Sequence, residues 1–339
     1  MNYKKTLLSI LIGLSATSAM ASFEKGLYGK EVISYKDSSE DFKATQSHLN
    51  GFLTYHQNRK SLYKIDVGTR SYIENGTDDY KYDVYVDQLF YAFKENDNAD
   101  LTIGRFLNPV GFYGSSPFDY SKHPFEIRKN IITSVDGAKV NYYGKADKEY
   151  YYDINVFAGT SLDVGHVDDR ELDQDTQLSY GANLKFANSV GSFNLGFYAS
   201  NNGKEFKVSD VSISESRSYL YQSNFGYEYS RNSIYAMAEY NRYDLKFENE
   251  SSSRVKEDLN FQIAYKVGSM MPMLGFTQEK NNNFFNSGSE TKDFTSMSTG
   301  FRYTFNKNSS LLGKYEYRMY DNADIDSDNL LSLGITLNY

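Results

Sequence analysis

The chain has 339 residues, with 32 Tyr and 23 Phe but only four Pro and neither Cys nor Trp. The lack of cysteine excludes disulfide scaffolds and thiol-based metal sites, and four histidines leave little material for a metal centre, so no metal or cofactor is expected. The net charge of −8 argues against a nucleic-acid partner, because phosphate binding depends on clustered Lys and Arg.

The first 21 residues have the layout of a secretory signal peptide. Lys4 and Lys5 precede an apolar run from Leu7 to Leu14, and small residues follow up to Ala21. We therefore expect export and cleavage before Ser22. Removal of the two lysines takes the formal charge from −8 to −10.

From residue 23 onward, segments of roughly ten residues alternate apolar and polar side chains, as β-strands do. No stretch in this part approaches the roughly eighteen apolar residues of a membrane-spanning helix. The clearest alternating segments are 149–158, 177–186, 192–200, 258–266, 298–305, 314–319 and 331–339.

Alternation fits either a soluble sandwich or a transmembrane barrel. Strands of about nine to eleven residues suit a tilted crossing of a bilayer, whereas about five to six is usual in soluble sheets. Tyr residues lie near the strand ends, where membrane interfaces favour them, and the last strand ends on Tyr339. These features favour an all-β, antiparallel transmembrane barrel over residues 22–339.

The connections set the expected strand count. Long and short connections alternate, as extracellular loops and periplasmic turns do in such barrels, and together they join sixteen strands, with fourteen or eighteen if one hairpin is misassigned. Sixteen strands leave room for an aqueous channel. The expected long loops are 37–46, 71–82, 107–135, 160–176, 201–216, 247–257, 281–293 and 321–328, and the expected turns are 58–60, 94–99, 145–148, 187–191, 230–232, 267–270 and 306–309.

The third long loop, 107–135, differs from the others. It holds Pro109, Pro117 and Pro124, three of the four prolines, together with five aromatic residues. Prolines stiffen a loop, and aromatic side chains give it something to pack against. We expect this loop to fold inward against the barrel wall and narrow the pore.

Around this loop the sequence resembles the general porins of Gram-negative outer membranes. The residues that carry the resemblance are Leu101-Thr102-Ile103-Gly104-Arg105-Phe106, Asn108-Pro109 and Gly111, Val135-Asp136-Gly137-Ala138, Asn141-Tyr142-Tyr143 and the terminal Leu-x-Leu-x-Ile-x-Leu-x-Tyr. It implies sixteen strands, a constriction formed by the third loop, an outer-membrane location and a homotrimer. The partners it implies are ions, small hydrophilic solutes, outer-membrane lipids and lipopolysaccharide.

Charges of opposite sign across a constriction orient polar solutes and discriminate ions. We expect the constriction to hold Arg105, Asp119, Lys122, Glu126, Arg128 and Asp136, and the lumen wall to hold Lys64, Arg70, Arg302, Lys314 and Arg318. An alternative for Arg105 and Asp136 is that they only fix the loop through hydrogen bonds.

Other functions receive less support. No HExxH, P-loop or GxSxG motif is present, so an enzyme is not expected. The acidic loop 160–176 lacks the glycine and terminal glutamate of a calcium loop, although divalent ions remain conceivable. A passive diffusion pore with slight cation preference leads, ahead of a substrate-specific channel and an adhesin or receptor-type barrel.

Overall fold

The structure is a computed structural model that describes most of the chain after the expected signal peptide. The described residues are 22–36, 41–73, 80–111, 132–147, 149–163, 178–202, 207–208, 211–212, 218–248, 250–282, 293–321 and 327–338. Within these ranges no helix is long and apolar enough to cross a membrane.

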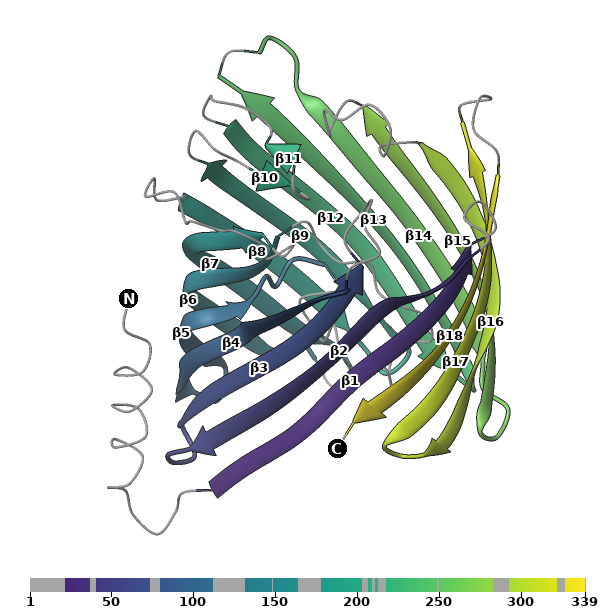
Figure 1. The fold of residues 1–339 in the computed structure, drawn as a ribbon. Helices are drawn as coiled ribbons and strands as arrows, with labels where there is room; N and C mark the ends of the chain where they lie inside the picture. Colours follow the sequence, from purple (N-terminus) through teal and green to yellow (C-terminus); the bar gives the residue numbers. More distant parts are fainter. Residues whose placement is uncertain are drawn as a thin grey trace.

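Sixteen antiparallel strands form one closed barrel, in which β1 closes the ring against β18 (Figure 1). The short strands β10 (Lys207–Val208) and β11 (Val211–Ser212) form a separate hairpin between β9 and β12. The prediction of a sixteen-stranded barrel is confirmed. The barrel strands are β1 (Ser22–Lys36), β2 (Asp41–His56), β3 (Ser61–Ile73), β4 (Tyr80–Asn96), β5 (Ala99–Leu107), β6 (Ile132–Lys145), β7 (Tyr151–Asp163), β8 (Leu178–Ala187), β9 (Gly191–Asn202), β12 (Ser218–Arg231), β13 (Ile234–Phe247), β14 (Arg254–Tyr265), β15 (Met270–Asn282), β16 (Phe294–Asn306), β17 (Ser309–Tyr320) and β18 (Asp328–Asn338).

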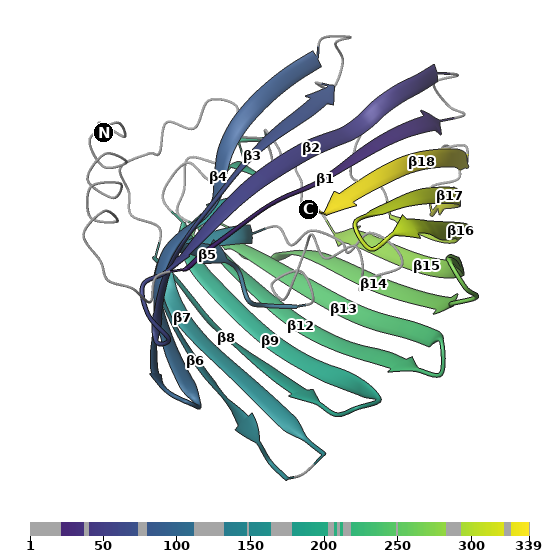
Figure 2. The same ribbon diagram turned by 90° about the horizontal axis from the view of Figure 1, so that it is seen from below.

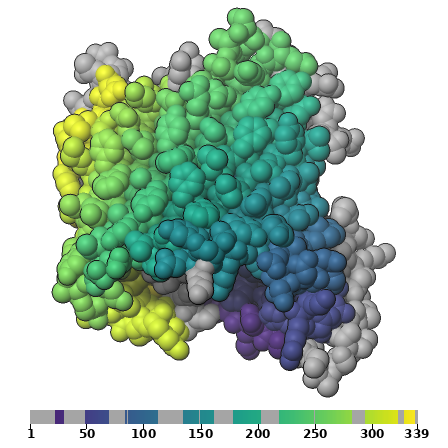
Figure 3. Space-filling model, turned by 180° about the vertical axis from the view of Figure 1, so that it is seen from behind, coloured from purple at the N-terminus to yellow at the C-terminus, as the bar shows by residue number. Residues whose placement is uncertain are grey.

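The pleat of each strand separates an outer face from a lumen face. On β9, Leu195 and Phe197 are 50% and 45% exposed, whereas the intervening Asn194, Gly196 and Tyr198 are buried. Figure 2 shows the strands arranged in a ring, and Figure 3 shows the outer wall that the central strands present. Apolar side chains therefore face outward and mostly polar ones inward, the pattern that a barrel surrounded by lipid requires.

Short turns join the strands at one end of the barrel. The turn between β12 and β13 is Asn232-Ser233, and both residues have positive φ, as the tight turns of two-residue hairpins require. Near this end, aromatic rings from four successive strands meet on the outer face, with centroids 4.8 Å apart for Phe23 and Tyr55 and for Tyr63 and Tyr91. The aromatic band expected at a membrane interface is thus built from Tyr and Phe without Trp.

At the opposite end, the strands extend further than the sequence predicts. Strand β2 begins at Asp41, inside the expected loop 37–46, and β4 begins at Tyr80, inside the expected loop 71–82. The physical reason is that ladder hydrogen bonds join backbone groups, so pairing continues where the apolar alternation has already ended.

Candidate functional site

The chain turns into the barrel directly after β5. Asn108 and Val110 are fully buried, and the Val110 amide donates a hydrogen bond to Asn108 Oδ1 at 3.2 Å. Val110 lies against the lumen face of β9, because a Cβ at Gly196 would lie 2.7 Å from Val110 Cγ1. Gly111, with φ of 78°, lies against Asn224 and Glu239 on β12 and β13. Residues 108–111, the first part of the expected inward loop, therefore lie inside the lumen.

The wall that receives Val110 is a row of side-chain amides. In cross-strand register, Asn141 on β6 pairs with Asn155, Asn155 with Asn183, Asn183 with Gly196, Gly196 with Asn224, and Asn224 with Asn241. We call these six residues the asparagine row. Gly196 is the one position in the row without a side chain, and Val110 occupies that gap.

Hydrogen bonds fix one end of the asparagine row. The amide nitrogen of Asn224 donates to Asn241 Oδ1 at 2.8 Å and to Glu239 Oε1 at 3.0 Å. All three side chains are at most 5% exposed. Buried polar groups of this kind cost free energy unless they are paired, so this network stiffens the wall under Gly111.

An apolar cluster surrounds Val110 inside the barrel. Phe106, Phe157 and Tyr198 follow one another around the wall, with successive ring centroids 6.3 Å apart. The entering segment packs against this cluster on one side of the lumen. Its buried members are Phe106, Val110, Val135, Phe157, Tyr198, Leu220, Tyr243, Leu245 and Phe247.

The strands on the other side of the barrel carry alternating charges on their lumen face. On β17, Glu316 Oε2 lies 2.5 Å from Lys314 Nζ, and its other carboxylate oxygen lies 2.6 Å from Arg318 Nε. Glu316 is only 6% exposed, while Tyr315 on the outer face is 43% exposed. On β14 and β15, Lys256 Nζ lies 3.1 Å from Glu279 Oε1. This wall therefore presents mixed charges held in fixed positions.

A second polar network lies on the lumen face of β1 to β4. Asp66 is fully buried and accepts hydrogen bonds from Tyr28 Oη at 2.6 Å and from Asn50 Nδ2 at 3.1 Å. Asn50 also donates to Asp87 Oδ2 at 3.4 Å. Lys64, two residues before Asp66 on the same face, extends over the Phe52 ring at 5.7 Å. These strands thus add one cation and two carboxylates to the lumen wall.

Four of the five expected wall residues lie on the lumen face: Lys64, Arg302, Lys314 and Arg318. Arg302 is 3% exposed, while its neighbour Tyr303 on the outer face is 42% exposed. The side chain of Arg70 is not described. Of the residues expected at the constriction, Asp119, Lys122, Glu126 and Arg128 lie outside the described residues.

Arg105 and Asp136 occupy a different place from the one expected. They pair directly across β5 and β6, with Nε to Oδ1 and Nη2 to Oδ2 both at 2.8 Å, and Arg105 Nη1 also donates to the Val86 carbonyl at 3.1 Å. Arg105 alternates with the buried Phe106 and shares its face with Ile103, which is 52% exposed. The expectation that this pair lines the pore is corrected, because strand alternation turns both side chains outward. The pair joins β5 to β6 where the chain leaves the wall. Whether it also fixes the loop stays a prediction, because residues 112–131 lie outside the described ranges.

Sequence reasoning did not single out the asparagine row, Glu316 or the pair of Asp66 and Asp87. Each lies at a polar position of an alternating strand, so a signal for the lumen face was present. What was missing was the register, which decides which polar residues become neighbours. Within the described ranges, no group of three His, Asp or Glu residues could hold a metal ion.

Comparison with known proteins gives a likeness of fold. No family model matches the sequence, and no curated protein matches it. Among solved structures, OmpT of Vibrio cholerae, described as outer-membrane expressed, superposes with a TM-score of 0.64 at 13% identity, covering 95% of this chain and 99% of that chain. An anion-selective porin from Comamonas acidovorans gives 0.64 at 10% identity, covering 94% and 100%.

A third match is OmpF of Salmonella typhi, with a TM-score of 0.60 at 15% identity, covering 94% of this chain and 97% of that chain. The coverage shows that the likeness extends over the whole barrel. At these identities it establishes that the chain has the porin-like fold of outer-membrane barrel proteins.

Proposed function

We propose that this protein is an outer-membrane porin, forming a water-filled channel for passive diffusion of ions and small hydrophilic solutes. The observation that carries the proposal is the entry of residues 108–111 into the lumen, where Val110 is seated in the gap at Gly196. A sixteen-stranded barrel is wide enough for an aqueous channel, and a segment that crosses its lumen narrows that channel to a size-selective passage.

The charged wall supplies the second part of the mechanism. Because the apolar cluster around Val110 occupies the side of β5 to β13, solutes pass along β14 to β18 and β1 to β4. There Glu316 lies between Lys314 and Arg318. Lys64 lies near Asp66, two residues further along the same face of β3. Fixed charges of both signs give a field that acts on ions and dipolar solutes without binding any one of them tightly.

The remaining constriction residues belong to this proposal. Asp119, Lys122, Glu126 and Arg128 would add charges to the narrow part of the channel. With a formal charge of −10 after signal cleavage, the protein would favour cations slightly.

The proposal includes location and assembly. Residues 1–21 would direct export and be removed, and the barrel would insert into the outer membrane of a Gram-negative bacterium, among its lipids and lipopolysaccharide. A homotrimer is supported by one structural neighbour, a Vibrio cholerae OmpT structure described as a trimer form. No enzymatic activity, cofactor, metal or nucleic-acid partner forms part of this function.

A substrate-specific channel is the second candidate. The observation that favours it is the series of charges on the lumen face of β17, where Lys314, Glu316 and Arg318 occupy successive lumen positions along the proposed solute path and would offer a charged solute a series of contacts. In such a channel, conductance would saturate with solute concentration, whereas passive diffusion would not.

Reconstitution into planar bilayers tests the proposal. Refolded protein should give stepwise conductance increases, and liposomes containing it should swell at rates that fall smoothly with solute size. Swelling that is fast for one solute class only would favour the substrate-specific channel. Absence of conductance from protein with folded-barrel mobility on gels would contradict both channel functions.

A further inference from the structure

Basic residues gather at the turn end of the barrel. Four connecting segments, which join β2 to β3, β12 to β13, β14 to β15 and β16 to β17, carry five cations and no Asp or Glu. All five side chains are exposed. The segments are 57–60, 230–233, 266–269 and 306–309. We call their charged residues the basic arc: Arg59, Lys60, Arg231, Lys266 and Lys307.

The excess of positive charge remains when the other charges of this rim are counted. Strand β1 begins here with Glu24 and Lys25, and Glu228 on the lumen face of β12 is held by two hydroxyl groups. The mature chain ends add one charge of each sign. From β12 round to β3 the rim thus carries six cations against two carboxylates. On the opposite side, residues 94–99 carry one cation and two carboxylates, and residues 145–149 carry two of each.

The basic arc lies at the end of the wall that remains open to solutes. In ring order the arc extends from β12 through β18 and β1 to β3. The apolar cluster around Val110 occupies the side of β5 to β13, so the proposed solute path follows β14 to β18 and β1 to β4. Ions that enter or leave this path at the turn end therefore pass the basic arc.

Inside the channel, the charges nearest the turn end are mainly positive. The first charged lumen residue from that end is Lys64 on β3, Arg302 on β16 and Lys314 on β17. On β1 the corresponding residue is a carboxylate, Glu24, and its Oε1 lies 3.3 Å from His56 Nε2. The positive charge of the basic arc thus continues into the lumen along three strands.

Carboxylates follow further along the same path. Asp66 comes after Lys64 on β3, and Glu316 comes after Lys314 on β17. Among the described side chains on this part of the lumen face, six carboxylates stand against three cations. The carboxylates are Asp66, Asp87, Asp258, Glu279, Glu316 and Asp328, and the cations are Arg254, Lys256 and Arg318. The path is therefore basic toward the turn end and acidic toward the loop end.

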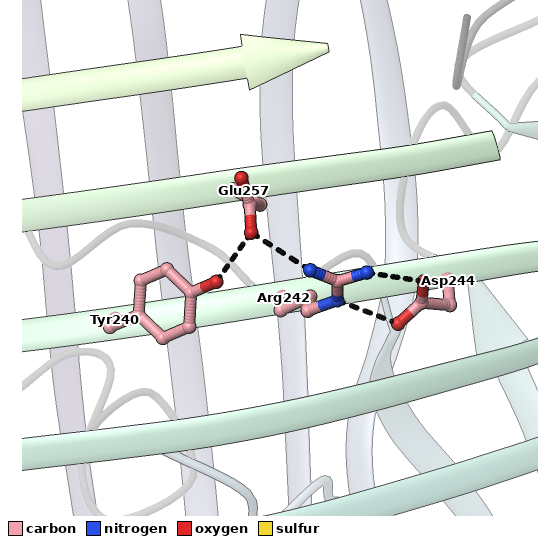
Figure 4. Close-up of polar contacts among 4 residues, drawn as sticks. All are labelled: Tyr240, Arg242, Asp244 and Glu257. Atoms are coloured by element: carbon pink, nitrogen blue, oxygen red, sulfur yellow. Dashed lines mark hydrogen bonds and ion pairs between the residues drawn. The ribbon is translucent and has the colours of Figure 1, made fainter. Parts of the chain in front are cut away.

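Charges on the outer face do not belong to this separation. Arg242 Nε and Nη2 bond the two carboxylate oxygens of Asp244 at 3.0 and 3.1 Å, and Arg242 Nη1 bonds Glu257 Oε1 at 3.1 Å (Figure 4). The Tyr240 hydroxyl donates to the same Glu257 oxygen at 2.6 Å. The residue between Tyr240 and Arg242 is Asn241, which is buried on the lumen face. Strand alternation therefore turns the whole network away from the channel.

We propose that this axial separation of charge makes the channel rectify, so that it conducts more current in one polarity than in the other. The inference rests on the proposed porin function. Anions gather at the basic turn end, and cations gather at the acidic loop end. When the loop side is positive, each end supplies the ion that it has gathered, and both ions accumulate in the channel. The opposite polarity depletes the channel of both ions and lowers the current.

Coulomb's law sets the size of the effect. Sixteen strands spaced about 4.8 Å apart and tilted about 40° place the basic arc roughly 16 Å from the barrel axis. In about 10 mM salt the Debye length is about 30 Å, and the arc then raises the anion concentration on the axis about three- to fourfold. We therefore expect currents of the two polarities to differ about twofold in about 10 mM KCl. In about 1 M KCl the Debye length is about 3 Å, so the difference should vanish.

The test is planar-bilayer recording at low voltage with a channel of known orientation. Because the chain has no cysteine, Ser269→Cys on a turn of the basic arc reacts alone with a thiol-reactive dextran too large to enter the channel. The side from which this reagent changes the conductance is the turn side. Current in about 10 mM KCl should then be about twofold larger with the loop side positive.

Two pairs of lysines provide matched variants. K266Q/K307Q removes two charges of the basic arc and should lower the ratio of the two currents, and K266E/K307E should lower it further. K246Q/K280Q removes the same charge from exposed positions on the outer face near the loop end, so it should keep the wild-type ratio. Gel mobility confirms that each variant forms a folded barrel.

Several results would overturn the inference. Equal currents of both polarities in about 10 mM KCl would do so, as would a larger current with the turn side positive. A ratio that K266Q/K307Q and K266E/K307E leave unchanged would show that the basic arc does not act on the ions. If K246Q/K280Q lowered the ratio equally, total charge and not its axial position would be responsible. Absence of conductance in both polarities would instead contradict the porin function, so the two failures are distinguishable.

Discussion

The contact between Val110 and Gly196 allows a quantitative test of how the inward segment is held. A methyl group placed on Gly196 would lie 2.7 Å from Val110 Cγ1 and 2.9 Å from Asn183 Oδ1. Carbon atoms normally approach to about 3.5–4.0 Å, so Val110 must move by about 1 Å. Overpacking of this kind costs about 1–3 kcal/mol, and we expect Gly196→Ala to destabilise the barrel within that range.

Val110→Ala perturbs the same contact from the other side. Val110 is fully buried, so loss of two methyl groups removes about 1.6 kcal/mol of burial, and the cavity raises the cost to about 2–3 kcal/mol. In the double variant the new methyl at 196 fills space that Val110 has left. The destabilisation of the double variant should therefore be smaller than the sum of the two single destabilisations by about 1 kcal/mol or more.

Urea unfolding in detergent micelles measures these free energies. The unfolding is monitored by far-ultraviolet circular dichroism and by the gel mobility of the folded barrel. Val140→Ala serves as the matched control, because Val140 is 50% exposed on the outer face. In the double variant of Gly196→Ala and Val140→Ala, the two free-energy costs should add. If the costs of Gly196→Ala and Val110→Ala also added fully, Val110 would not occupy the gap in the asparagine row, and the inward segment would not be fixed at this wall.

Two further variants test the assignment of faces. Arg105→Ala should leave conductance and reversal potential unchanged, because Arg105 points outward. It should lower stability by about 1–2 kcal/mol, because Asp136 loses its partner. A changed reversal potential would show that Arg105 lines the channel. Glu316→Gln removes the carboxylate between Lys314 and Arg318 on the lumen wall, so the reversal potential in a salt gradient should shift toward anions. An unshifted potential would place β17 away from the ion path.

Much of the fold follows from local rules that operate within a single strand. The alternation in 177–186 predicts β8 and its two faces, because successive side chains of a pleated strand point to opposite sides. The same rule indicates that Arg105 shares a face with Ile103. The expectation for Arg105 went wrong because it followed proximity to the loop instead of strand parity.

Other features depend on how separate strands meet. The asparagine row draws on Asn141, Asn155, Asn183, Asn224 and Asn241, which are scattered over one hundred residues of sequence without any recognisable motif. Their alignment is decided by the shear of the barrel, and a one-residue shift in pairing would turn a whole strand's polar set outward. Cross-strand register likewise brings Arg242 on β13 to Glu257 on β14.

By itself the sequence indicated the fold: an antiparallel transmembrane barrel of alternating strands, with sixteen as the favoured count, and one unusual proline-bearing loop. These properties are periodic or compositional, so they can be recognised within single segments of the sequence. The tertiary structure decided which residues share the lumen, that Val110 fills the gap at Gly196, and that Arg105 and Arg242 face outward. Those outcomes depend on register and closure of the ring, which fix neighbours that are distant in sequence and that no local pattern specifies.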